Sequence, residues 1–152
     1  MKKREVIGLF LIIATVCFLS SCDRSIQRFQ QQNQISEAER ACVDKVIAID
    51  DSIGKIRNKE CQKLSLSQTI SNYTDKMKKI STEGCPKEFS KSFNQHIDSW
   101  KNLLEVTDKY PEMRGEMHDL FKELEKSKDS AVFKKLKNVV WETWDLVEIT
   151  SK

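Results

Sequence analysis

Cys22 is the residue whose neighbours most clearly specify a chemical modification. It ends the run Leu19-Ser20-Ser21-Cys22, in which a branched aliphatic residue and two small residues precede the cysteine. This pattern is a lipobox, and a basic start, Lys2-Lys3-Arg4, and an apolar run from Val6 to Leu19 come before it. It predicts transfer of a diacylglycerol group to the Cys22 thiol, cleavage before Cys22 and acylation of the new amino terminus.

The alternative for residues 1–21 is an uncleaved membrane anchor. The apolar run is about 14 residues long, which is shorter than the roughly 20 residues that a spanning helix needs and matches a signal peptide. Asp23 follows the modified cysteine. By resemblance to enterobacterial lipoproteins, an acidic residue there favours retention in the inner membrane over the outer membrane. We therefore expect a lipid-anchored protein of the bacterial cell envelope that faces the periplasm.

The other cysteines could form a disulfide in that oxidising compartment. Cys17 leaves with the signal peptide, so Cys42, Cys61 and Cys85 remain as an odd set. A helix from Cys42 to Cys61 rises about 28 Å, and a returning helix would bring Cys85 back to the level of Cys42. Since a disulfide needs Cα atoms within about 7 Å, we predict a Cys42–Cys85 bridge and an unpaired Cys61.

His96 is the most interesting single residue of the remaining chain. It lies on the apolar face of a predicted helix, between Phe93 and Trp100. If the last helix packs beside it, His96 could bond to Thr143 or Glu148. Two interpretations stay open: a buried structural histidine, or the floor of a ligand groove lined by Trp100 and Trp144. The candidate cluster comprises Phe89, Phe93, His96, Trp100, Thr143, Trp144 and Glu148.

No pattern in the sequence identifies a catalytic, metal or cofactor site. HExxH, CxxC, CxxCH and GxSxG are absent, and so is a glycine-rich phosphate loop. Asp50-Asp51 and the pair Glu123 and Glu125 are carboxylates that we place on solvated helix faces. We therefore predict no catalytic residue, no metal ligand and no cofactor, and a protein that is not an enzyme.

The charge balance also limits the partners. Without residues 1–21 the chain keeps 23 basic and 22 acidic side chains of the 26 and 23 in the whole sequence. Binding to nucleic acid requires a one-sided basic face, and a nearly neutral chain gives no support for it. The remaining 131 residues suffice for one domain with a modest core.

Residues 35–152 read as helical throughout, after a polar tether in 22–34. Apolar residues recur at steps of three and four, and Ser36 with Glu39 forms a capping box that begins the first helix. Gly54 weakens that helix by about 1 kcal/mol relative to alanine. We expect its apolar face to consist of Cys42, Val46, Ile49, Ile53 and Ile56.

Three further segments have helix signals. Ser65-Leu66-Ser67-Gln68 forms a second capping box that begins the second helix, whose apolar face is Leu66, Ile70, Tyr73, Met77 and Ile80. Gly84 suits its left-handed end and Pro86 the first turn of the third, which we expect to run to Tyr110. The apolar face of the last helix, capped by Ser127 or Asp129, is Val132, Leu136, Val140, Thr143 and Val147, with Trp141 and Trp144 flanking it. We predict an all-α, up-down bundle of four long helices, with a short connecting helix in 112–126.

Two motifs in these helices resemble those of a known group of proteins. They are Cys85-Pro86-x-x-Phe89-x-x-x-Phe93-x-x-His96-x-x-x-Trp100 and Thr143-Trp144-x-x-Val147-Glu148. The chain resembles a group of short exported bacterial proteins, often lipoproteins, of unassigned function. The resemblance covers about a third of the mature chain, implies a small helical domain and supplies no activity.

The sequence favours a non-enzymatic protein-binding module, such as a subunit of an envelope complex, an inhibitor or an immunity protein. One alternative is a small-ligand or metal-binding bundle that uses His96, Trp100 and Trp144. A further alternative is a thiol-based redox protein that uses Cys61.

Overall fold

The structure is a computed structural model, and it describes residues 35–152. The predicted signal peptide, Cys22, Asp23 and the tether in 22–34 lie outside the described residues. The expectation of an all-helical domain is confirmed, and no strand occurs between residues 35 and 152. The helices are α2 (Glu37–Glu60), α3 (Leu66–Met77), α4 (Lys87–Asn102), α5 (Leu104–Thr107), α6 (Met117–Leu124) and α7 (Ser130–Thr150).

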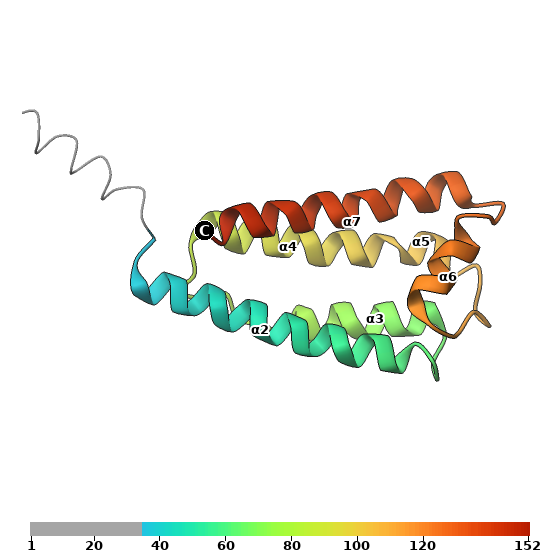
Figure 1. The fold of residues 1–152 in the computed structure, drawn as a ribbon, viewed down its shortest axis with the longest axis horizontal. Coiled ribbons are helices and arrows are strands. Elements are labelled where there is room, and N and C mark those ends of the chain that lie inside the picture. The colour runs from blue at the N-terminus through green and yellow to red at the C-terminus, as the bar shows by residue number, and fades with distance from the viewer. Residues whose placement is uncertain (1–34) are drawn as a thin grey trace, which may run out of the picture. The chain divides into compact units, whose positions relative to one another are not determined.

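Each of the four longer helices packs against the next one in sequence (Figure 1). α2 packs against α3, α3 against α4, and α4 along α7. The short α5 and α6 lie at the end where the chain passes from α4 to α7. The other end holds the start of α2 and the carboxyl terminus, where the Arg40 guanidinium donates to the Lys152 carbonyl at 3.1 Å.

The predicted helix starts at Ser36 and Ser65 are confirmed. The Ser36 hydroxyl accepts from the Glu39 amide at 3.2 Å, and the Glu39 carboxylate accepts from the Ser36 amide at 2.9 Å, which completes the capping box. Ser65 caps α3 through the Gln68 amide, but the return bond from the Gln68 side chain is not formed, so the expected second capping box is only half present. Gly84 adopts a φ of 87°, a left-handed conformation that glycine takes without steric cost, but it lies in the turn before α4 and does not end α3 as expected.

Other boundaries differ from the expected ones. α3 ends at Met77 because the next amides form tighter bonds three residues back, from Lys79 to Lys76 and from Ile80 to Met77. The expected third helix is interrupted at Leu103, where it divides into α4 and α5.

The short helix is shorter than expected, whereas α7 begins directly after Asp129, one of the two expected cap residues. The short helix α6 occupies only Met117–Leu124 of the range 112–126. Asp129 makes no side-chain cap for α7. Its carboxylate accepts instead from Lys109 and from the Tyr110 hydroxyl, each at 2.8 Å. Asp129 therefore ties the start of α7 to the end of the α4–α5 segment.

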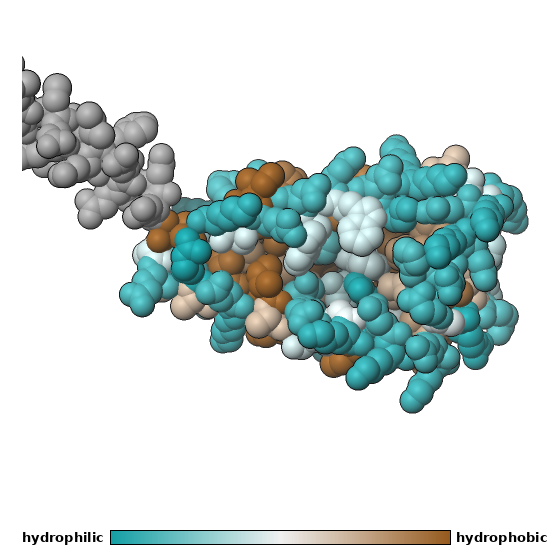
Figure 2. Space-filling view, viewed as in Figure 1, coloured by the Kyte–Doolittle hydropathy of each residue, from teal (hydrophilic) through white to brown (hydrophobic). Residues whose placement is uncertain are grey.

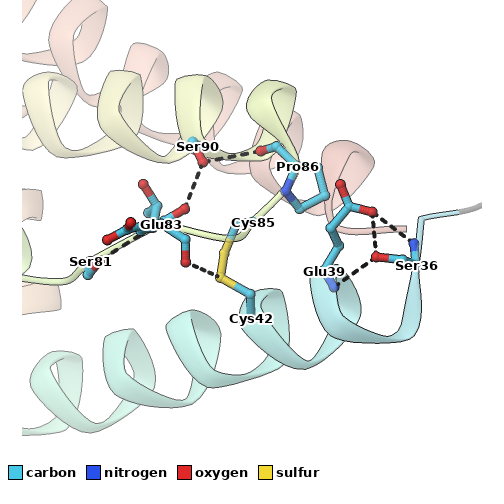
Figure 3. Close-up of a disulfide and its surroundings, with 9 residues drawn as sticks. Ser36, Glu39, Cys42, Ser81, Glu83, Cys85, Pro86 and Ser90 are labelled. Carbon is cyan, nitrogen blue, oxygen red and sulfur yellow. Dashed lines mark hydrogen bonds between the residues drawn. A yellow bond between two sulfur atoms is a disulfide. The ribbon is translucent and has the colours of Figure 1, made fainter.

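The predicted disulfide is confirmed. Cys42 and Cys85 are joined with their Cα atoms 5.2 Å apart (Figure 3), and Cys61 is the free cysteine of the described residues. The Cys42 sulfur also lies 3.5 Å from the Glu83 carbonyl oxygen, a contact without a shared proton because a disulfide sulfur carries none. The bridge fixes α2 to the connection between α3 and α4.

The core lies between the four longer helices. Phe89 and Phe93 of α4 are fully buried and stack with ring centroids 5.9 Å apart. Phe133 of α7 is fully buried and packs edge-on against Phe121 at 5.2 Å. Aromatic side chains thus fill the core near the start of α4, and again where α6 meets the start of α7.

Candidate functional site

A groove of about 370 Å³ opens between α2 and α7. Asp50, Gly54 and Arg57 of α2 form one side, and Trp141 and Trp144 of α7 form the other. Tyr73, His96 and Trp100 form the floor, and Met117 and Phe121 close one end. Figure 2 shows pale and brown surface on the face between α2 and α7, bordered by hydrophilic side chains. The sequence contains three tryptophans, and all of them line this groove.

His96 forms a bridge between α4 and α7 beneath the groove. The Trp100 indole N–H donates to His96 Nε2 at 3.1 Å, and His96 Nδ1 lies 3.2 Å from the Thr143 hydroxyl. Because Nε2 accepts, the proton of the neutral ring is on Nδ1, which donates to Thr143. Trp144 packs on the same imidazole, with ring centroids 5.1 Å apart. With one ring nitrogen accepting a hydrogen bond and the other donating one, His96 is neutral.

Burial reinforces that protonation state. His96 is 4% exposed, and the loss of hydration lowers the pKa of its imidazole to about 4. A hydrogen bond at the Val140 backbone opposes this shift, and the nearby Arg57 charge adds to it. A proton on Nε2 would also remove the acceptor of the Trp100 indole. His96 is thus a buried hydrogen-bond acceptor at neutral pH.

Arg57 places its guanidinium on the aromatic floor. Its Cζ atom lies 4.6 Å from the centre of the Tyr73 ring and 4.3 Å from that of Trp100, which is the geometry of a cation–π contact. Burial lowers the pKa of the guanidinium, but an arginine remains charged in proteins. The groove therefore contains a partly desolvated positive charge.

Asp50 is buried beside this charge. Its carboxylate accepts from the Tyr73 hydroxyl at 2.8 Å, and burial raises the pKa of Asp50 while Tyr73 and Arg57 lower it. Burial and the Asp50 carboxylate together raise the pKa of the Tyr73 hydroxyl. The expectation that Asp50 lies on a solvated face is wrong: it is 9% exposed.

The structure divides the predicted cluster into three groups. His96, Trp100 and Trp144 line the groove, and Thr143 supports His96. Phe89 and Phe93 lie in the core and do not reach the groove. Glu148 is exposed and accepts from the Trp144 indole N–H at 2.8 Å. Of the two partners considered for His96, it is Thr143 that bonds to it.

Sequence reasoning missed the contribution of α2. The apolar face expected there included Ile49 and Ile56, but Ile56 is 45% exposed. The residues of α2 that face the rest of the molecule follow the spacing Val43, Val46, Asp50, Ile53 and Arg57. Two of these residues are charged. Because the prediction considered only apolar residues, it placed the core-facing side of α2 at the wrong angle around the helix. The heptad-like spacing of Asp50 and Arg57 from Val43 was the available signal.

Other candidate chemistry is sparse in residues 35–152. No three His, Cys, Asp or Glu side chains of this region gather as a potential metal site. Cys61 is completely buried, and burial raises the pKa of its thiol, so little of it would be the reactive thiolate. Among the helices described here, none is both long and apolar enough to cross a membrane.

No family model, curated protein or solved structure gives a significant match to the chain.

Proposed function

We propose that the protein is a non-enzymatic binding module, held by a lipid on Cys22 at the periplasmic membrane face, that binds a protein partner through the groove between α2 and α7. Its domain would be an up-down bundle of four helices. The observation that carries the proposal is the exposed aromatic edge of the groove. Trp141 is 54% exposed there, although burying an aromatic side chain is normally favourable.

The surface beyond the groove supports a protein partner. Four of the five large apolar side chains that are exposed in the described residues belong to α7: Val132, Trp141, Leu146 and Ile149. Ile149 is 65% and Leu146 44% exposed. Protein interfaces gain most of their affinity from central tryptophan, tyrosine and arginine residues, which are the residue types of Trp141, Tyr73 and Arg57. At 3.6 residues per turn, Ile149 lies about 80° around α7 from Trp141, so a partner segment lying along that side of the helix would cover both side chains.

A small-ligand binding protein is the second candidate. The groove volume of about 370 Å³ is within the range of small-molecule sites, which are mostly apolar with a few convergent polar groups. This candidate leaves the exposed residues of α7 beyond the groove without a role. We therefore rank it below a protein partner.

The anchor rests on the lipobox, and the resemblance to short exported lipoproteins agrees with it. Replacing Cys22 by serine is expected to abolish lipid attachment and membrane retention, because the acyl chains on the modified cysteine are expected to anchor the protein in the bilayer. Metabolic labelling with a fatty acid, followed by membrane fractionation, measures both effects. Retention of label and membrane association in Cys22→Ser would contradict the anchor; Cys61→Ala, which alters only the buried cysteine, should keep both.

Site-specific crosslinking in living cells tests the binding surface. A photoreactive amino acid at position 141 is expected to form one abundant adduct with a protein, because this side chain is exposed at the edge of the groove. The same amino acid at Lys79, which is exposed beyond the end of α3, serves as the control and should not form it. An equal adduct from both positions would show that the partner does not use this groove.

A further inference from the structure

The groove holds a cation whose hydrogen-bond donors lack an anionic acceptor. None of the ion pairs within residues 35–152 includes Arg57. Its Nε and Nη2 atoms both donate to Asn58 Oδ1, at 3.2 and 3.1 Å. A guanidinium has five N–H donors, and no nitrogen of Arg57 is among the fully buried unpaired atoms of the described chain. Arg57 lines the groove, and its Nη1 atom makes no hydrogen bond within residues 35–152, so this nitrogen can donate to a bound group.

The acidic side chains around the groove already have partners. Asp50 accepts from the Tyr73 hydroxyl at 2.8 Å. Asp51 pairs with Lys55 at 2.6 Å, and the Glu116 carboxylate accepts from the Asp119 amide at the start of α6 at 3.0 Å. Asp50 attracts Arg57 electrostatically without forming an ion pair with it. What the groove lacks is an anion in contact with Arg57.

Resting on the proposed function, we infer that the partner inserts an acidic side chain whose carboxylate binds Arg57, next to an apolar side chain that packs on Trp141. A carboxylate matches the planar donor geometry of a guanidinium. The guanidinium of Arg57 already packs on the rings of Tyr73 and Trp100. The Arg57 side chain therefore loses little conformational freedom when the carboxylate binds. Charge-assisted hydrogen bonds of this kind are the stronger class in proteins.

Tryptophan fluorescence of the full-length protein in detergent micelles tests this inference, because every tryptophan of the chain lines the groove. The probes are two sets of capped dipeptides, in which glutamate or glutamine follows Leu, Met or Phe. We expect the glutamate set to bind about tenfold more tightly. Arg57→Gln should abolish this preference. Lys59→Gln, which removes an exposed charge of α2 outside the groove, should keep it.

The outcomes separate this inference from the proposed function. Equal binding of the two sets to the natural protein, with both lost in Gly54→Leu, would overturn the role of Arg57 and leave an apolar binding groove. A preference that persists in folded Arg57→Gln would also overturn it. Arg57→Lys keeps the charge, so a reduced but measurable preference there supports the inference even if Arg57→Gln fails to fold. No response to either set would contradict both the inference and the groove as a binding site.

Discussion

Replacing Cys42 and Cys85 together by serine is expected to lower the free energy of unfolding by about 4 kcal/mol. The bridge spans a sequence separation of 43 residues, and on the chain-entropy model closing a loop of that length restricts the unfolded chain by about this amount. The bridge also fixes the start of α2 to the entry of α4, so its loss should loosen that end first. Urea unfolding of the oxidised protein, followed by circular dichroism, measures the difference.

The double variant provides its own control. A reducing agent should destabilise the natural chain to the level of the double variant and leave the double variant unchanged, because Cys61 has no partner to lose. A loss below about 1 kcal/mol would mean that the unfolded chain is already restricted without the bridge.

Acidification from pH 7 to pH 4 is expected to cost the folded state about 3 kcal/mol through His96 alone. Its folded pKa of about 4 lies below the ordinary value of 6.5. Above pH 6.5 both states are neutral and the full stability is present. Between pH 6.5 and pH 4 the unfolded chain binds the proton more readily, so stability falls as the pH falls.

Comparison with His96→Gln isolates this contribution. Glutamine can still accept a hydrogen bond from Trp100 and does not titrate in this range. Asp50 acts in the opposite direction, since burial raises its pKa and the folded state then gains stability as this carboxyl takes up a proton. Urea unfolding at pH 7 and pH 4 should show a smaller acid loss in the variant by about 3 kcal/mol. Equal losses in the two proteins would contradict a buried neutral His96.

The parts of the fold that sequence reasoning predicted are those that local chemistry determines. The capping box of Ser36 and Glu39 and the serine cap of α3 each depend on a few adjacent residues, and so does the left-handed conformation of Gly84, although its predicted place at the end of α3 was wrong. The disulfide followed from helix length and chain reversal. The end of α3 and the break at Leu103 could not be predicted in this way, because neither coincides with a glycine or proline.

The site was predicted in part because its α4 and α7 residues follow apolar spacing. His96 stood out as a polar residue on an apolar face, and Trp144 was placed at its level. Arg57 and Asp50 were missed because they are charged residues at core-facing positions, which become favourable only when Tyr73 and Trp100 are present. Such compensation between helices distant in sequence is not visible in the pattern of one helix.

Gly54 gives the most direct test of the central claim that the groove between α2 and α7 is the binding surface. It lines the groove, and the nearest atom to an added Cβ is Arg57 Nη2 at 3.9 Å. Alanine therefore fits and improves helix propensity by up to about 1 kcal/mol, whereas leucine fills the groove. The measurement is the yield of the in-cell adduct from position 141 in these two variants. We predict that Gly54→Ala keeps the adduct and Gly54→Leu loses it at unchanged protein level. An undiminished adduct in Gly54→Leu would contradict the account.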